Sequence, residues 1–171
     1  MASLMEELLD TLEKEHEQYV LLLELSERKT DIIVKRDITA LEQITDEEQI
    51  VVNRISHLDT KRETVTNDIA NVINKDVESL KLTKLIELLA GQPKEQKRLI
   101  DIQEKLKVTV GNVRKINEHN QSLIAQSLEM IEFDMNMMQA MTQAPQTANY
   151  GRNAINVGET LGRIGGFDAK Q

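Results

Sequence analysis

A heptad repeat runs through residues 41–72, LEQITDEEQIVVNRISHLDTKRETVTNDIANV. Its positions follow one another in alternating steps of three and four: Leu41, Ile44, Glu48, Val51, Ile55, Leu58, Arg62, Val65, Ile69 and Val72. This spacing places all ten side chains along one seam of a helix, facing a neighbouring helix. The repeat therefore predicts a packed helix over residues 38–73, with Asp37 as its N-terminal cap.

The residues before this helix have the same spacing: Met5, Leu9, Leu12, His16, Tyr19, Leu23, Ser26, Thr30 and Ile33. Ser3 and Glu6 match the capping box that begins a helix, so we predict a first helix over residues 4–35. We interpret Arg36 and Asp37 as a short hairpin connection that brings the second helix back antiparallel along the first. A fold-back at residue 36 predicts that His16 lies near Ser56 and that Arg62 lies near Asp10.

Two further helices are predicted beyond residue 79. A short one over residues 80–90 is expected to end at Gly91 in a left-handed cap, and Pro93 suits the first turn of the next. That last helix, residues 93–143, would be about 70 Å long at about 1.5 Å per residue, so one end is expected to extend past the shorter first helix. Its predicted seam is Leu99, Ile102, Leu106, Val110, Val113, Asn117, Asn120, Ile124, Ser127, Ile131, Asp134, Met138 and Met141.

The composition agrees with an all-α fold. The 171 residues include two Phe, two Tyr and no Trp, so aliphatic side chains must form nearly the whole core. We predict an antiparallel bundle, or coiled coil, of three long helices with one short extra helix over residues 1–144. Residues 145–171 hold five of the seven glycines and few apolar residues, which predicts a flexible tail.

Charge and cysteine content narrow the function classes. With 21 basic and 29 acidic residues the net charge is −8, which disfavours nucleic acid and anionic membranes as main partners. The absence of cysteine removes disulfides, thiolate zinc sites and cysteine nucleophiles. No apolar run approaches the roughly 18 residues that insert into a bilayer, and the first residues lack the pattern of a signal peptide. We therefore expect a cytoplasmic protein.

Neither a metal site nor an enzyme is indicated. Glu13 and His16 have the spacing of a di-iron bundle ligand pair, but such sites need a second Glu-x-x-His pair. The other histidines, His57 and His119, lack a glutamate three residues earlier. No nucleophile is accompanied by a base in a pattern that the helix faces would bring together. We expect no cofactor, no metal and no catalytic activity.

Two sets of seam residues stand out. Polar side chains at seam positions lower stability but fix the register and pairing of helices, so Glu48, Arg62, Asn117 and Asn120 are predicted to be structural. Methionines crowd the end of the last helix on more than one face: Met130, Met135, Met137, Met138 and Met141. Methionine adapts to varied helical partners, which favours binding, although ordinary core packing with a frayed end is an open alternative.

Three stretches, in this order and spacing, resemble the FlgN-type flagellar export chaperones over almost the whole chain. The first is DITAL at residues 37–41, followed by Glu48 and by LDTKR at residues 58–62. The second is Asn117-x-x-Asn120-x-x-Leu123-Ile124. The third is Tyr150-Gly151 ahead of a glycine-rich tail, although Ala154 stands where the family has a second glycine.

This resemblance implies a cytoplasmic chaperone of the flagellar type III export system without ATPase activity. It would bind the C-terminal helical segment of the hook-filament junction proteins FlgK and FlgL and prevent their premature association. It would then deliver them to the cytoplasmic domain of the export gate, with Tyr150 and Gly151 at the docking position. An amphipathic cargo helix needs an apolar groove, for which we select the end of the last helix. The predicted cargo-binding residues are Ile131, Phe133, Met135, Met138 and Met141.

A second function class fits the same pattern. The long helix could self-associate into a structural coiled-coil scaffold without any role in export. Sedimentation separates the two, since a scaffold forms a stable oligomer, whereas a chaperone stays monomeric or forms a weak homo-oligomer and accepts a helical peptide.

Overall fold

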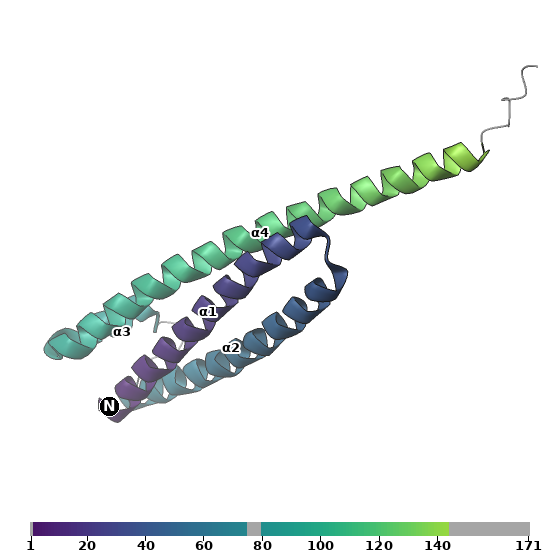
Figure 1. Ribbon diagram of the computed structural model, residues 1–171. Helices are drawn as coiled ribbons and strands as arrows, with labels where there is room; N and C mark the ends of the chain where they lie inside the picture. The colour runs from purple at the N-terminus through teal and green to yellow at the C-terminus, as the bar shows by residue number, and fades with distance from the viewer. Residues whose placement is uncertain (1, 75–79, 144–171) are drawn as a thin grey trace, which may run out of the picture. The chain divides into compact units, whose positions relative to one another are not determined.

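The computed structural model describes residues 2–74 and 80–143, and within these ranges the chain is helical with no strand. The long helices are α1 (Ala2–Lys35), α2 (Ile38–Ile73) and α4 (Pro93–Gln143), shown in Figure 1. Between α2 and α4 lie α3 (Leu82–Leu88) and the 3-10 turn η2 (Leu89–Gly91). The predicted all-α class is confirmed. The predicted flexible tail, residues 145–171, lies outside the described residues.

The chain divides into two compact units, residues 1–126 and residues 127–171. Helix α4 begins in the first unit and ends in the second. The first unit contains α1, α2, α3 and the part of α4 up to residue 126. The described part of the second unit is the end of α4, residues 127–143.

In the first unit, α1 and α2 form an antiparallel hairpin, which Figure 1 shows closed by a tight turn. Arg36 makes this turn in the left-handed region, with φ 57°. Asp37 then caps α2, because its Oδ1 accepts a hydrogen bond from the backbone N–H of Ala40 at 3.0 Å. The predicted cap is thus present, and it starts α2 within two residues of the end of α1.

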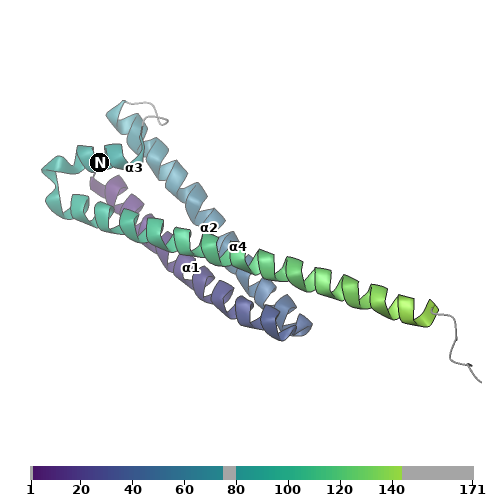
Figure 2. The same ribbon diagram turned by 90° about the horizontal axis from the view of Figure 1, so that it is seen from above.

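Helix α4 runs parallel to α1 in the first unit. Three contacts show this direction, because Arg98 binds Glu6, His16 contacts Thr109, and Asn120 binds the backbone of Ser26. In these three contacts the partners are separated by 92 to 94 residues in the sequence, from the start of α1 to Ser26. In the view of Figure 2, the part of α4 that belongs to the first unit lies across the hairpin. The result is an up-down-up arrangement of three long helices.

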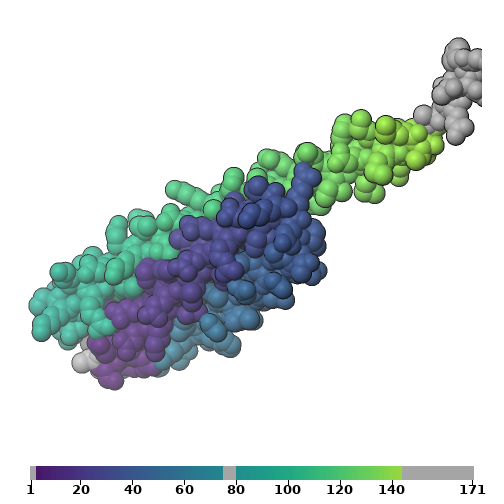
Figure 3. Space-filling model, viewed as in Figure 1, coloured from purple at the N-terminus to yellow at the C-terminus, as the bar shows by residue number. Residues whose placement is uncertain are grey.

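The core of the first unit consists of two apolar clusters. One joins the start of α1, the end of α2, α3 and the start of α4, around Leu9, Ile69, Leu85 and Leu99. The other includes Leu22, Leu25, Ile44, Val51, Ile55 and Val113. In Figure 3 the side chains of α1 lie between those of α2 and those of the first part of α4. Two polar pairs, Glu15–Arg62 and His16–Thr109, lie between the clusters along the three helices.

Two predictions about helix ends were wrong. Helix α1 already includes Ala2, so Ser3 lies in its first turn instead of capping it, and Glu6 binds Arg98 from α4. Gly91 lies in η2, and none of the described glycines has a positive φ. Gln92 precedes Pro93 and is non-helical, with φ −129° and ψ 78°, because proline disfavours the helical region for the residue before it. The short helix therefore ends through a 3-10 turn instead of a left-handed glycine.

Candidate partner-binding surface

The end of α4 carries a dense set of exposed apolar side chains. Each is between 47% and 73% exposed: Leu128, Met130, Ile131, Phe133, Met135, Met137, Met138 and Met141. We call these eight residues the methionine surface. Exposed apolar patches of this density mark sites of interaction with other molecules. All five residues predicted to bind cargo, Ile131, Phe133, Met135, Met138 and Met141, belong to this surface, and their role stays a prediction.

The charges around this surface have one sign. Residues 127–143 include Glu129, Glu132 and Asp134 but no Lys, Arg or His, which gives a net charge of −3 over this segment. A partner with basic residues beside its own apolar stripe would be attracted to it. Methionine side chains are unbranched and polarisable, so they can repack around different partners. This part of α4 is suited to binding a basic amphipathic helix.

The two residues predicted for docking at the export gate, Tyr150 and Gly151, lie outside the described residues.

A buried polar network joins the three long helices of the first unit. The Asn120 amide, 3% exposed, donates to the Ser26 carbonyl at 2.9 Å and accepts from the Thr30 hydroxyl at 2.6 Å. The Ser26 hydroxyl donates to Glu48 of α2 at 3.2 Å, and the ammonium of Lys29 binds the same carboxylate at 2.6 Å. We call these five residues the Asn120 network. It fixes the position of α4 along the hairpin, because Asn120 finds both partners at only one register.

Asn117 is not part of this network. It is exposed one turn before Asn120, so the prediction that it lies in the packed seam was wrong. The buried or half-buried residues of α4 follow steps of three and four through Thr109, Val113, Ile116 and Asn120. The seam therefore passes beside Asn117 on the neighbouring face of the helix.

Arg62 lies between the two apolar clusters and binds Glu15, with 3.4 Å between Nε and Oε2. It also pairs with Asp59 of its own helix. The Glu15 side chain is 6% exposed and that of Arg62 is 34% exposed. Burial raises the pKa of Glu15, and the nearby positive charge of Arg62 offsets only part of this effect. Arg62 therefore stabilises the charged form of the Glu15 carboxylate, whereas burial disfavours that form.

The predicted partner of Arg62, Asp10, lies on another face of α1. Asp10 contacts Arg98 of α4, whose guanidinium also binds Glu6 at 2.7 Å and Glu13 at 3.0 Å. The hydrogen bonds that Arg98 donates to the carboxylates of Glu6 and Glu13 raise the pKa of Arg98. The prediction of an Arg62–Asp10 contact was therefore wrong, because the acidic stripe containing Asp10 faces α4 while Glu15 faces α2.

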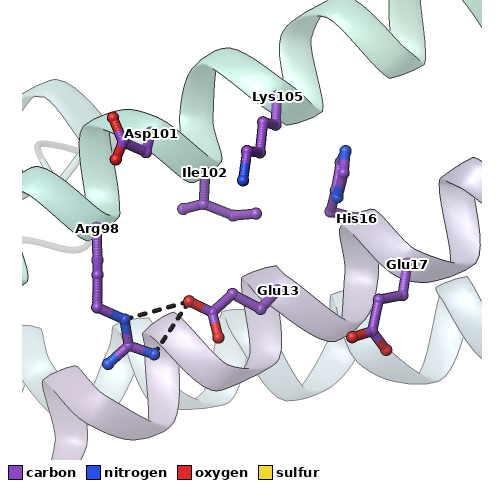
Figure 4. A pocket seen from close by; sticks show the side chains of 7 residues that line it. All are labelled: Glu13, His16, Glu17, Arg98, Asp101, Ile102 and Lys105. Atoms are coloured by element: carbon purple, nitrogen blue, oxygen red, sulfur yellow. Dashed lines mark hydrogen bonds and ion pairs between the residues drawn. The ribbon is translucent and has the colours of Figure 1, made fainter.

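A polar pocket opens beside this cluster, between α1 and α4. Its lining includes Glu13, His16 and Lys105, and Figure 4 shows Glu13 directed toward Arg98 with two marked contacts. His16 Nε2 lies 3.1 Å from the Thr109 hydroxyl, so His16 contacts α4 instead of Ser56 on α2, where it was predicted. Glu13 and His16 are therefore engaged by different residues of α4, which separates the pair that resembled metal ligands.

A family model for FlgN, described as FlgN protein, matches residues 1–157. This chain belongs to the FlgN family. FlgN proteins are flagellar export chaperones, which confirms the predicted family and the general class of function. The match extends over the first unit and the methionine surface and includes Tyr150 and Gly151. No curated protein and no solved structure gave a match.

Two further findings concern this FlgN-family chain. No helix in the described ranges is both long and apolar enough to cross a membrane. Among residues 2–74 and 80–143, no three His, Cys, Asp or Glu side chains are grouped so that they could hold a metal ion.

Proposed function

We propose that this chaperone binds the C-terminal helical segment of the hook-filament junction proteins FlgK and FlgL in the cytoplasm. It prevents their premature association and delivers them to the cytoplasmic domain of the export gate, without catalysis and without a cofactor. The observation that supports this proposal is the methionine surface, eight exposed apolar side chains at the end of α4 in a member of a chaperone family. The cargo contacts are assigned to Ile131, Phe133, Met135, Met138 and Met141.

The chemistry of this surface suits transient binding. An amphipathic cargo helix buries its apolar side in contact with α4, as in other cases where a helix docks on an apolar face. A chaperone must also release its cargo, and flexible methionines lose side-chain entropy when they become ordered, which limits the affinity. Phe133 is the one aromatic side chain of the surface. The complex is therefore expected to be adaptable and reversible.

The first prediction concerns Met138→Asp. Because Met138 is 67% exposed, the change should leave the fold intact while placing a charge where the cargo helix buries apolar surface. We expect binding of a peptide covering the C-terminal helix of FlgK or FlgL from the same organism to weaken at least tenfold. Calorimetric titration measures this, and the wild-type complex should show a negative heat-capacity change.

The matched control is Gln139→Asp, which adds the same charge at the next residue of the same exposed helix. It should bind the peptide as the wild type does. Equal losses for the two variants would mean that charge alone lowers affinity and would contradict a contact at Met138. If the wild type bound neither FlgK nor FlgL, the proposed cargo would be wrong.

The second prediction separates gate delivery from folding. Removal of residues 146–171 deletes Tyr150 and Gly151 but none of the buried residues of the first unit. We expect the melting temperature to stay within about 2 °C of the wild-type value, because no described core contact is lost. Binding to the cytoplasmic domain of the export gate should fall at least tenfold. A large loss of melting temperature would contradict this division of roles.

A self-associating scaffold is the other candidate. The net charge of −3 over residues 127–143 opposes it, because two copies paired through this surface would bring like charges together. Sedimentation of the purified chain should therefore show a monomer or a weak dimer, and a stable higher oligomer would favour the scaffold.

A further inference from the structure

The methionine surface consists of two separate stripes. Leu128, Ile131, Met135 and Met138 follow one another in steps of three, four and three, and form stripe A. Met130, Phe133, Met137 and Met141 follow in steps of three, four and four, and form stripe B. At about 100° per residue, the centres of the two stripes lie about 135° apart around the helix axis. Both stripes are exposed over their whole length.

Polar residues mark the boundaries of the stripes. Asp134 lies between them on the apolar side of the helix at about 240° from Leu128, by the same geometry of about 100° per residue. The opposite side of the helix is polar and consists of Glu129, Glu132, Asn136, Gln139 and Gln143. The apolar surface is therefore wider than one helix-packing stripe and carries a carboxylate in its middle.

This width exceeds what one partner helix covers. Helices pack with their axes about 8–10 Å apart, so a helix seated on stripe A and another seated on stripe B would have axes about 15–18 Å apart. One helix cannot span that separation, and one helix centred between the stripes would bury Asp134 without burying either stripe fully. Two helices, one on each stripe, would bury both and leave Asp134 in the gap, in contact with water.

We infer that the end of α4 is clamped by two amphipathic helical segments of one cargo molecule, the C-terminal helix on one stripe and a second helix on the other. This inference rests on the proposed function and specifies the partner of the same surface. Each segment carries Lys or Arg beside its apolar stripe, because residues 127–143 contain three acidic and no basic side chains. A second copy of this chain would present the same acidic surface and is disfavoured for that reason.

Three consecutive residues provide the test. Met135 lies on stripe A, Asn136 on the polar side and Met137 on stripe B, and all three are exposed. Met135→Asp, Asn136→Asp and Met137→Asp each add one negative charge within a single turn, so they differ only in the direction that the charge faces. Circular dichroism of the full chain checks that all three variants keep the helical content of the wild type.

Binding is measured to full-length FlgK or FlgL and, separately, to the peptide covering its C-terminal helix. For the full-length cargo, Met135→Asp and Met137→Asp should each weaken binding at least tenfold, and Asn136→Asp less than threefold. For the peptide, only one of the two methionine variants should weaken binding. Raising the salt concentration from 50 to 500 mM should weaken the full-length complex further, because exposed charge pairs are screened.

Three results would overturn the inference. If only one of the two methionine variants weakened binding of full-length cargo, a single helix would dock, and the proposed function would stand alone. If the wild type sedimented as a dimer that both methionine variants returned to a monomer, the occupant would be a second copy. If the wild type bound neither junction protein, the proposed function would fail, and the two-helix clamp would fail with it.

Discussion

Replacing Asn120 with aspartate is expected to lower the free energy of unfolding by about 3 kcal/mol at pH 7. The two side chains have nearly the same shape, so the change tests hydrogen bonding and charge instead of packing. The Asn120 amide donates to the Ser26 carbonyl, and a carboxylate has no proton to donate there. The new charge would also be buried beside the Ser26 hydroxyl–Glu48 pair, with only the Thr30 hydroxyl positioned to donate to it.

Chemical denaturation of the full chain measures this loss, and Asn117→Asp is the matched control. Asn117 lies three residues earlier on the same helix and is exposed, so its variant should change stability by less than about 0.5 kcal/mol. Hydrogen exchange adds a local readout, because the amides of α4 around Asn120 should exchange faster in the Asn120 variant. Equal stability of the two variants would show that the Asn120 network does not hold α4 in place.

Arg62→Met is expected to destabilise the first unit by about 2 kcal/mol at pH 7. Methionine keeps much of the apolar stem of arginine but leaves the Glu15 carboxylate, 6% exposed, without its cationic partner. Loss of one member of a fully buried ion pair lowers the free energy of unfolding by about 3–5 kcal/mol. We expect the lower value of about 2 kcal/mol here because Arg62 is partly exposed. Arg54→Met is the control, since Arg54 is an exposed arginine of the same helix.

The cost of Arg62→Met should depend on pH in a defined direction. Burial raises the pKa of Glu15 above its ordinary value of 4.5, and removing Arg62 raises it further. Below pH 4.5 Glu15 is protonated in both the folded and the unfolded chain, so no charge is buried and the cost is small. The cost of Arg62→Met grows as the pH rises through the raised pKa of Glu15 in the folded state, because Glu15 then becomes charged. Denaturation of both proteins at pH 4 and pH 7 measures the difference.

A second substitution identifies the source of that cost. Glu15→Gln removes the charge, so the double variant Glu15→Gln/Arg62→Met should recover most of the stability at pH 7. A cost of Arg62→Met that is the same at both pH values, or that persists in the double variant, would point to lost packing of the arginine stem instead of an unpaired carboxylate.

The sequence predicted the helices well because their signals are local. Heptad spacing, the Asp37 cap and Pro93 at the start of α4 each depend on neighbouring residues, and the described helices begin and end close to the predicted positions. Which residues contact one another across the bundle depends on how each helix is rotated about its own axis. Heptad spacing alone does not determine that rotation. The predicted α4 seam used Val110 and Asn117, whereas the buried seam uses Thr109 and Ile116. Both sets of positions follow steps of three and four. The apolar side chain of Val110 favoured the set that includes the exposed Asn117.

The same limit applies to the candidate site. The methionine cluster was visible in the sequence, but core packing and partner binding could be separated only by exposure, which requires the fold. Arg98 was overlooked, although Glu6, Asp10 and Glu13 recur at steps of four and three and form an acidic stripe that needs a basic partner. Glu15 was overlooked because it lies outside the predicted seam of α1.

The parallel pairing of α1 and α4 has an evolutionary consequence. Ser26 and Thr30 meet Asn120 across a separation of 90 to 94 residues. A change at position 30 or position 120 removes the hydrogen bond between the Thr30 hydroxyl and the Asn120 amide, so a compensating change at the facing position restores fitness. Among related chains, a hydroxyl at position 30 should therefore occur together with an amide at position 120, and aliphatic residues should appear at both positions at once. Residue 117, which faces outward, should vary independently of both.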